Sequence, residues 1–379
     1  MNNYPRVVVI AEAGVNHDGN FDRAKSLIDA AADIGADIVK FQAFKAENMV
    51  TQKALKAGYQ RKQMGSEVSQ YQMLKDLELS GDAHKALAEY CQIRNIEFMS
   101  TPFDIESVNM LANLGLPRFK IASGEITNLP LLRVIGGFGR PIFLSSGMSE
   151  LEEVNSALEV LEAAGTKRSM VTVLQCNTEY PTPVEDVNLR AMISMRKDLG
   201  VDVGYSDHTL GTDIPLAAVA LGATVIEKHL TLDRTLPGPD HSASLEADEF
   251  EEMIQGIRRI EAAMGEKVKK PTKSEKPNIE VARKSIVAAR PIETGELFCT
   301  ENLACKRPAT GLSPMLWDKI IGIPAKKDFG KDRTICYALD CSAMMKVENL
   351  SKKLKKRWGC LNGVVANVGD GRSILEPIP

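Results

Sequence analysis

The chain of 379 residues lacks several features that would narrow its class at once. It has no apolar run near the roughly 18 residues of a membrane span, its formal net charge is only −3, and its seven Cys are scattered without a CxxC pair. So small a net charge creates no overall field that attracts nucleic acid or an anionic membrane. An odd, dispersed set of Cys argues against a disulfide framework. The N-terminal segment also lacks the basic start and apolar core of a signal peptide, so we expect a cytoplasmic protein.

Nucleotide-binding loops are missing as well. The chain contains no GxxxxGK[ST] motif, and no GxGxxG motif follows a strand-like run. Both motifs bind nucleotide phosphates through backbone N–H groups near a helix start. We therefore expect neither kind of nucleotide site.

One pattern is present eight times: a short β-branched run that ends in polar or small residues, followed by an amphipathic helix. The runs are residues 7–13, 37–42, 97–103, 118–125, 141–148, 171–180, 201–208 and 224–229. Helical patterns lie between them, for example at residues 22–34, 107–114, 151–164 and 248–264. Eight such repeats in about 265 residues predict an α/β fold, a (β/α)8 TIM barrel. An open doubly wound sheet is the structural alternative.

The composition changes after the eighth repeat, which predicts further parts of the chain. We expect the barrel over residues 1–265 and a linker over 266–280, a segment rich in Lys, Pro and Glu. Strand-like runs predict a small, mostly β domain over residues 281–334, followed by an atypical tail of unknown structure over 335–379. Between the second and third strand-like runs of the barrel domain, a long insertion at about residues 45–78 is expected to be a lid or binding loop.

Two of the five His, His208 and His229, end neighbouring strand-like runs and are 21 residues apart. In a repeating β/α unit, this spacing puts both imidazoles on the same rim of a parallel sheet. Two His at neighbouring strand ends could share a divalent metal. The alternative is two unrelated polar residues at strand ends.

Polar and ionisable side chains recur at the ends of all eight runs, where barrel active sites lie. They are Glu12, Asn16, His17, Lys40, Gln42, Ser100, Thr101, Lys120, Ser123, Glu125, Ser145, Ser146, Asn177, Thr178, Tyr180, Ser206, Asp207, His208, Glu227 and His229. A Gly-Pro-Asp-His turn after the eighth run would bring Asp240 and His241 over the same mouth. Polar groups that converge in a concave mouth are typical of a binding site.

This set of residues indicates a chemistry. Lys40 and Lys120 could bind a phosphate or carboxylate through charge-assisted hydrogen bonds, with help from Ser123 and Ser145. A metal on the two imidazoles would act as a Lewis acid on a carbonyl, and Glu12 suits acid–base work. A lysine at a strand end also allows a Schiff-base aldolase. The residues alone therefore predict a barrel enzyme that acts on an anionic, polyhydroxylated small molecule.

Longer stretches of the chain resemble a known family. They are AEAGVNHDG, VKFQAFKAE, STPFD, KIASGEITNLPLL, LSSGM, CNTEYPTPVEDVNL, GYSDHTLG, EKHLTLD and GPDHSAS, and then ARKSIVA, KRPATGLSP and WDKIIG. Together these stretches resemble the bacterial N-acetylneuraminate (sialic acid) synthases that carry a C-terminal antifreeze-like (SAF) domain. The resemblance covers roughly residues 5 to 334 in the family's order and implies a domain-swapped homodimer.

The resemblance also implies roles for matching residues. It implies a divalent metal, Mn2+ or Mg2+, on His208 and His229, and catalytic roles for Glu12, Lys120, Glu227 and His208. The residues it assigns to substrate binding are Lys40, Gln42, Thr101, Ser123, Ser145, Asn177, Thr178, Tyr180, Ser206, Asp240 and Arg307. Arg307 would reach the amino sugar from the partner chain.

The implied reaction joins phosphoenolpyruvate to N-acetylmannosamine. C3 of phosphoenolpyruvate attacks the aldehyde carbon, water adds at C2, and phosphate leaves with C–O cleavage. A sister activity is the alternative, in which a legionaminic or pseudaminic acid synthase uses a diacetamido-dideoxy hexose. A non-catalytic carbohydrate-binding barrel is an alternative from another class, although binding alone needs no metal pair. No nucleic acid or membrane partner is expected.

Overall fold

The computed structural model of the protein describes residues 6–64 and 69–336. The chain divides into two compact units, Met1–Lys267 and Val268–Pro379. This division falls inside the segment 266–280 that the sequence predicts as a linker. Residues 337–379, which make up nearly all of the atypical tail, lie outside the described residues.

Within the described residues, the first unit contains an eight-stranded parallel sheet. Its strands are β1 (Val8–Gly14), β2 (Ile38–Ala43), β3 (Glu97–Pro102), β4 (Phe119–Ile121), β5 (Ile142–Ser145), β6 (Val171–Gln175), β7 (Asp202–Asp207) and β8 (Val225–His229). The order is β3-β2-β1-β8-β7-β6-β5-β4, so strands that follow one another in the chain are neighbours. The end strands β3 and β4 also come into contact. The sheet is therefore a nearly closed barrel, which confirms the predicted TIM architecture.

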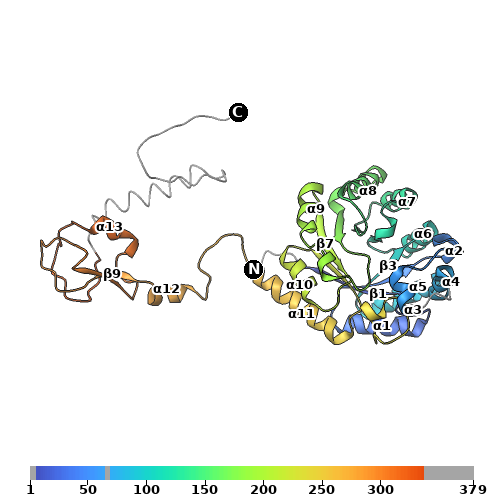
Figure 1. Ribbon diagram of the computed structural model, residues 1–379, viewed down its shortest axis with the longest axis horizontal. Coiled ribbons are helices and arrows are strands. Elements are labelled where there is room, and N and C mark those ends of the chain that lie inside the picture. The colour runs from blue at the N-terminus through green and yellow to red at the C-terminus, as the bar shows by residue number, and fades with distance from the viewer. Residues whose placement is uncertain (1–5, 65–68, 337–379) are drawn as a thin grey trace, which may run out of the picture. The chain divides into compact units, whose positions relative to one another are not determined.

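Helices surround this barrel (Figure 1). They are α1 (Phe21–Asp33), α2 (Ala46–Met49), α3 (Gly58–Met64), α4 (Gln70–Leu77), α5 (Gly81–Ile93), α6 (Ile105–Asn113), α7 (Leu129–Gly137), α8 (Leu151–Ala164), α9 (Ala191–Leu199), α10 (Asp213–Ala220) and α11 (Ala247–Met264). Several helices begin at side chains that accept a hydrogen bond from the N–H three residues later, as Asn20, Ser80 and Asp104 do. Such caps satisfy N–H groups that have no partner inside the helix.

The insertion at 45–78 is more regular than the predicted loop, since it holds α2, α3 and α4. Ser69 caps α4 by accepting from the N–H of Gln72, and Met73, Leu74 and Leu77 bury one face of that helix. The apolar residues of α4 have helical spacing. The pattern is too short and interrupted in the sequence to predict a helix. The insertion still forms part of the cavity described below.

Three predicted strands end earlier than expected. The runs 118–125, 141–148 and 171–180 contain the strands β4, β5 and β6, which end at Ile121, Ser145 and Gln175. After β4 the chain turns directly into the 3-10 helix Ser123–Glu125. The residues beyond these strand ends are loops that carry side chains for the site.

The second unit has its own small core. Its elements are α12 (Lys276–Ala282), β9 (Ser285–Ala288), β10 (Leu303–Lys306) and α13 (Trp317–Ile320), and β9 and β10 pair antiparallel. Ile286, Phe298 and Ile320 are fully buried or nearly so in this core. The extended linker predicted over 266–280 is wrong at its end, because α12 begins at Lys276. Pro277 in the first turn of α12 suits a helix start, where no N–H partner is needed.

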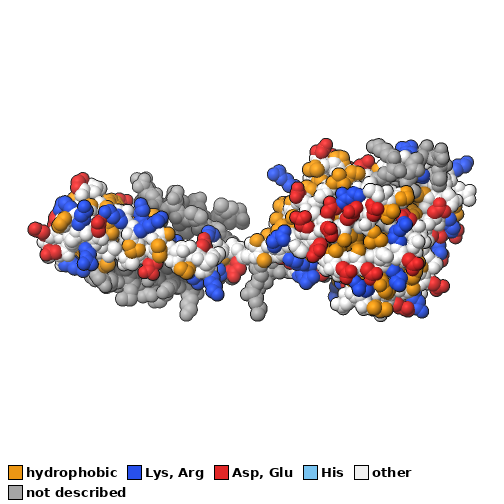
Figure 2. Space-filling view, turned by 90° about the horizontal axis from the view of Figure 1, so that it is seen from below, with side chains coloured by type: hydrophobic (Ala, Val, Ile, Leu, Met, Phe, Trp, Pro, Cys, Tyr) orange, Lys and Arg blue, Asp and Glu red, His pale blue; other side chains and the backbone are white. Residues whose placement is uncertain are grey.

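The surface agrees with the small net charge. On the face that Figure 2 shows, acidic and basic side chains are intermingled over the barrel unit. Such a mixture produces no field of one sign on that face. Among the described residues, no helix combines the length and the apolar character needed to cross a membrane.

Candidate active site

The alternation of side chains along parallel strands builds the site in layers. The bottom of the barrel interior is an apolar cluster formed by Ile10, Ile38, Met99, Phe143, Leu174 and Val225. Because successive side chains point to opposite faces, the residues two positions further along point inward again. They are Glu12, Lys40, Thr101, Ser145, Cys176 and Glu227, and all six line one cavity of about 560 Å3. The site therefore lies directly on top of the apolar core.

Buried ionised groups form the floor of this cavity. Lys40 Nζ lies 2.6 Å from Glu12 Oε2 and 3.6 Å from Glu227 Oε1, and Lys120 Nζ lies 3.4 Å from Glu227 Oε1. Lys40 also donates to Thr101 Oγ1, and Ser206 donates to Glu227 Oε1 over 2.9 Å. Buried charges are tolerated only when paired in this way.

The two carboxyl groups differ in acidity. Burial raises the pKa of Glu12 to about 7, with the attraction of Lys40 opposing the rise. Burial acts in the same direction on Glu227, but the attraction of Lys120 and Lys40 outweighs it and lowers the pKa of Glu227 to about 2. Burial lowers the pKa of Lys120, and the attraction of Glu227 opposes this shift. Glu227 is thus the fixed negative charge, whereas Glu12 is able to exchange a proton near neutral pH.

A cluster of small donors lies beside Lys120. Ser123 Oγ accepts from the N–H of Gly147 over 3.0 Å and lies 3.1 Å from Cys176 Sγ. Ser145 Oγ is buried and has no hydrogen-bond partner among the described residues, and the same is true of Glu227 Oε2. A buried polar atom without a partner is costly, so Ser145 Oγ and Glu227 Oε2 are atoms whose hydrogen bonds a molecule in the cavity could complete.

The predicted pair of imidazoles comes together at the rim. The ring centroids of His208 and His229 are 5.5 Å apart, and Tyr180 stacks on His208 at 4.1 Å and meets His229 edge-on at 5.5 Å. Burial lowers the pKa of His208 to about 4 and that of His229 well below its ordinary value. Both rings are therefore neutral near pH 7 and retain a lone pair.

The donor set fits a divalent metal. His208 Nδ1 donates to the carbonyl oxygen of Asn177 over 2.5 Å, which leaves Nε2 as the ring atom with the free lone pair. His229 Nδ1 is buried without a hydrogen-bond partner among the described residues. Among all the residues that the structure describes, no group of three or more His, Cys, Asp or Glu side chains could hold a metal. A metal here would therefore take its other ligands from substrate and water, as Mg2+ commonly does.

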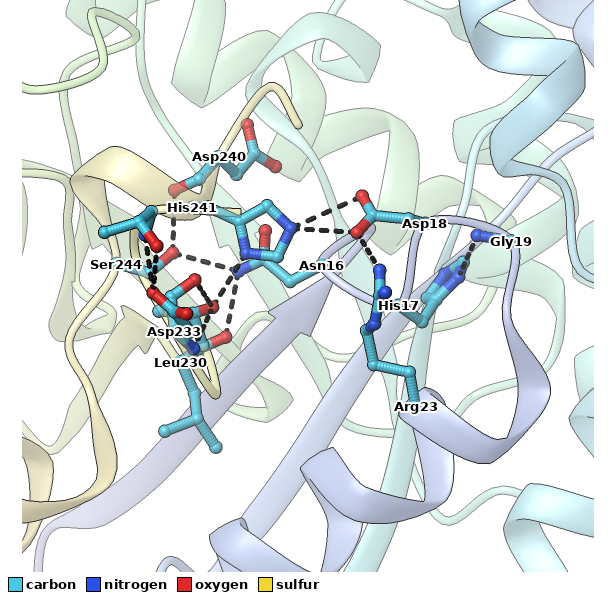
Figure 3. Close-up of polar contacts among 12 residues, drawn as sticks. Asn16, His17, Asp18, Gly19, Arg23, Leu230, Asp233, Asp240, His241 and Ser244 are labelled. Carbon is cyan, nitrogen blue, oxygen red and sulfur yellow. Dashed lines mark hydrogen bonds and ion pairs between the residues drawn. The ribbon is translucent and has the colours of Figure 1, made fainter. Parts of the chain in front are cut away.

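Asp240 reaches the cavity from the segment that follows β8. Its Oδ2 lies 3.9 Å from His229 Nδ1, and burial raises its pKa to about 6. Figure 3 shows the polar contacts that hold this segment against the loop after β1, including Asn16 Nδ2 donating to the carbonyl oxygen of Leu230 and to Ser244 Oγ. Asp240 is thus presented by a segment fixed at both ends.

Part of the cavity lining is apolar. Val15, Met49, Met73, Leu74, Leu77 and Phe103 line it, and these residues belong to one hydrophobic cluster in which α4 packs against the loops after β1 and β3. We call these six residues the apolar wall. Tyr59 and Gln60 from α3 also line the cavity, and the Tyr59 ring lies 4.9 Å from Tyr180. The lysines that line the described cavity are Lys40 and Lys120.

Most residues predicted for the site are brought together. Fourteen residues, Glu12, Lys40, Gln42, Thr101, Lys120, Ser123, Ser145, Thr178, Tyr180, Ser206, His208, Glu227, His229 and Asp240, line the cavity. Asn177 contributes its carbonyl oxygen to His208 rather than its side chain to the lining. Arg307 belongs to the second unit, where it is exposed, and its role stays a prediction.

Other polar residues of the predicted rim support structure instead. Ser100 contacts His84 on the outer side of β3, and Asp207 pairs with Lys228 and Thr209. These residues occupy the alternate positions of their strands, so they point outward. Tyr59 and Gln60 belong to the insertion predicted as a lid or binding loop, although the sequence did not single them out, and sequence reasoning missed Cys176. Counting in steps of two from Leu174 would have found Cys176.

Comparisons with known proteins agree with this geometry. The model of the NeuB family matches residues 27–269, and that of the SAF domain matches residues 283–338. An N,N'-diacetyllegionaminic acid synthase of Campylobacter jejuni is 52% identical over 330 residues, which cover 87% of this chain and 99% of the relative. One of Legionella pneumophila is 43% identical, covering 87% and 93%. A crystal structure of an N-acetylneuraminic acid (sialic acid) synthetase from Leptospira borgpetersenii is similar with TM-score 0.65 at 35% identity, covering 73% of this chain and 90% of that one.

Proposed function

This chain belongs to the NeuB family, and we propose that it condenses phosphoenolpyruvate with a deoxy-diacetamido hexose to give an N,N'-diacetyllegionaminic acid and phosphate. The observation that carries the proposal is the cavity, which joins a two-lysine floor to an apolar wall. The first part suits an anion, and the second suits a sugar with few hydroxyl groups.

The choice of sugar departs from the expectation drawn from the sequence. N-acetylmannosamine was the leading expectation, with the diacetamido sugar as its alternative. Relatives named diacetyllegionaminic acid synthases are 52% and 43% identical to this chain, whereas the similar sialic acid synthetase structure is 35% identical. These comparisons support the alternative better.

In the proposed reaction the chain's own residues bind and orient the two substrates. Lys40 and Lys120 hold the phosphate and carboxylate of phosphoenolpyruvate, with Ser123 and Ser145 as further donors. A carbon–carbon bond forms between C3 of phosphoenolpyruvate and the aldehyde carbon of the sugar. Water then adds at C2, and phosphate leaves with cleavage of its C–O bond. Fixing both substrates in attack geometry lowers the barrier by up to about 7–11 kcal/mol.

Glu12 and the histidine pair assist at the aldehyde. A carboxyl group with a pKa of about 7 suits proton transfer near neutral pH, so we assign Glu12 the role of general acid–base. When bound to His208 and His229, a divalent metal supplies Lewis-acid polarisation of the carbonyl oxygen. Tyr180 keeps the two imidazoles oriented through its ring contacts.

The apolar wall supports an unphosphorylated sugar with a methyl end. A phosphate group on the sugar would call for a cationic partner, and none of the six wall residues is charged. A methyl group against Leu74 and Leu77 instead buries apolar area. The wall therefore favours a 6-deoxy sugar over a sugar 6-phosphate.

The test is phosphate release from phosphoenolpyruvate with each of three sugars: the deoxy-diacetamido hexose, N-acetylmannosamine and N-acetylmannosamine 6-phosphate. We expect the first to give kcat/KM at least about tenfold above the others, as a methyl group in an apolar pocket allows. A chelator should abolish release, and Mn2+ or Mg2+ should restore it. Higher kcat/KM with either of the other sugars would contradict the proposed substrate.

Two variants serve as controls. Lys120→Met should abolish phosphate release with every sugar, because it removes a cation from the floor. Leu74→Asn keeps the branching of the side chain but places an amide in the wall, so it should reduce the preference for the deoxy sugar over the other two sugars. The ratio of kcat/KM values is insensitive to the amount of folded protein. Sugar binding without phosphate release in the wild type would instead favour a non-catalytic carbohydrate-binding barrel.

A further inference from the structure

His241, next to Asp240 in the chain, is fully buried and has both ring nitrogens engaged. Nδ1 lies 2.7 Å from Thr231 Oγ1, and Nε2 lies 3.1 Å and 3.3 Å from the two carboxylate oxygens of Asp18. Figure 3 shows the contacts between His241, in the segment after β8, and Asp18, in the loop after β1. Neither Asp18 nor His241 lines the described cavity, so substrate contact does not account for their pairing.

The direction of one of these hydrogen bonds follows from its partner. His241 Nδ1 is bonded to the Thr231 hydroxyl, which can take either role because it also lies 3.1 Å from the carbonyl oxygen of Asp233. A carboxylate only accepts, so His241 Nε2 donates to Asp18. Both ring nitrogens are therefore engaged, and the ring cannot rotate without losing a bond at each end.

The surrounding chain leaves little room for another arrangement. A Cβ atom at Gly238 would lie 2.6 Å from His241 Cδ2 and 2.9 Å from Asp18 Oδ1. The turn before Asp240 thus packs directly on the Asp18–His241 pair. Asp18 also pairs with Arg23 at the start of α1, which anchors the carboxylate to the barrel.

Asp240 is consequently held on both sides. Its carbonyl oxygen accepts from Ser244 Oγ over 2.7 Å, and the residue that follows it is the pinned His241. Asp240 is only 6% exposed, and its carboxylate lines the cavity near His229. We propose that Asp18 and His241 are positioning residues that fix the Asp240 carboxylate for the incoming amino sugar. This inference rests on the proposed function for its substrate.

Substitution of Asp18 tests the proposal. Asp18→Ala removes the acceptor of His241, and Asp18→Asn keeps an acceptor oxygen without the charge. We expect Asp18→Ala to raise KM for the sugar about tenfold, with a smaller rise for Asp18→Asn and with kcat within about threefold of wild type. The KM for phosphoenolpyruvate should not change. An equal rise in both KM values, or a fall in kcat alone, would overturn the positioning role.

A double-mutant cycle identifies Asp240 as the residue acted on. If Asp18 acts through Asp240, the Asp18→Ala and Asp240→Asn changes together should raise the sugar KM no further than Asp240→Asn alone, since coupled residues are non-additive. Additive effects would overturn the proposal. His84→Gln is the matched control, because His84 is equally buried and is bonded to Ser80 and Ser100 away from the cavity. It should lower Tm without changing the sugar KM.

Hydrogen exchange separates this inference from the proposed function. In the substrate-free protein, Asp18→Ala should speed amide exchange across residues 238–244, because the segment loses its anchor. Unchanged exchange there would overturn the positioning role whatever the enzyme's activity. If the wild type released no phosphate with any sugar, the proposed function would be overturned. The exchange result would still decide whether Asp18 and His241 fix the segment that carries Asp240.

Discussion

At the scale of single residues, Glu12 and Glu227 show how neighbours set chemistry. Both are buried in the barrel on adjacent strands, yet the pKa of Glu12 rises to about 7 and that of Glu227 falls to about 2. Glu227 lies within 3.6 Å of both Lys40 and Lys120, whereas the ion pair of Glu12 is with Lys40, and the neighbouring charge of Glu227 helps to raise the pKa of Glu12. Environments that push the pKa values of two carboxyl groups apart in this way give one group an acid–base role and leave the other as a fixed charge.

The first prediction concerns the metal. His208→Ala removes one of two imidazoles while leaving the fold, so Mn2+ affinity should fall at least about tenfold and metal-dependent phosphate release should be lost. Titration calorimetry measures the first quantity, and a thermal melt checks that the fold survives. Unchanged Mn2+ affinity together with normal phosphate release would remove the metal role from His208.

A second prediction concerns pH and His17. Burial lowers the pKa of this ring to about 4 from an ordinary 6.5. Between pH 6.5 and 4, His17 is therefore protonated in the unfolded chain but stays neutral in the folded chain. The free energy of unfolding consequently falls as pH drops from 6.5 to 4. The loss from this group is on the order of 3 kcal/mol.

Urea unfolding at several pH values measures this effect. His17→Asn keeps an acceptor for the N–H of Gly19 but has no titrating ring. Its unfolding free energy should therefore fall less steeply than that of the wild type between pH 6.5 and 4. Parallel curves for the two proteins would show that His17 does not titrate as described.

At the scale of elements, strand alternation decides which polar residues reach the cavity. Within β3, Thr101 lines the cavity while its neighbour Ser100 contacts His84 on the outer side. The sequence already contained this information, because side chains alternate in steps of two from a buried anchor such as Met99. The early end of β4, after which Ser123 begins a 3-10 helix, required the tertiary structure.

A third prediction concerns the loop after β5. A Cβ atom at Gly147 would lie 2.8 Å from both Ser123 Oγ and Thr178 Cγ2. Gly147→Ala should therefore push these groups apart and raise KM for phosphoenolpyruvate about tenfold, with less effect on the sugar. Gly137→Ala in α7 is the matched control, since nothing lies within 4 Å of its Cβ position. Steady-state kinetics with each substrate varied measures both KM values. Equal KM values for phosphoenolpyruvate in the two variants would contradict the close approach at Gly147.

At the scale of the whole molecule, Arg307 is the residue of the second unit that resemblance to the family assigns to substrate binding. The turn that carries it is held by Ser285, whose hydroxyl donates to the carbonyl oxygen of Pro308 and accepts from the N–H of Gly311. Arg307 itself is exposed. We propose that it acts on the barrel of a second copy in a homodimer, as resemblance to the family implies.

Mixing two inactive variants tests this fourth prediction. If Arg307 acts across subunits, a mixed dimer of Lys120→Met and Arg307→Ala chains has one site with both defects and one with none. Phosphate release should then recover to about half the wild-type rate per mixed dimer, by symmetry of the closed pair. If Arg307 acts within its own chain, each site keeps one defect and co-expression restores nothing. Light scattering checks that dimers form.

Much of the fold followed from the sequence because its signals are local. The eight apolar runs, the helices between them and the strand-end residues depend on periodicity and capping, which neighbouring residues decide. The boundaries of β4 to β6 and the helices in the insertion were missed. Those features depend on packing, such as that of Leu74 and Leu77 in the cluster beside the cavity.

The sequence by itself determined the barrel, the identity of the rim side chains and the family. Only the tertiary structure decided that Glu12 and Glu227 have opposite pKa shifts, that the apolar wall completes the cavity, and that Asp18 meets His241. The reason is physical: Coulomb attraction and hydrogen bonds act over a few ångströms in space. Asp18 and His241 are 223 positions apart in the chain, and closure of the barrel brings them into contact.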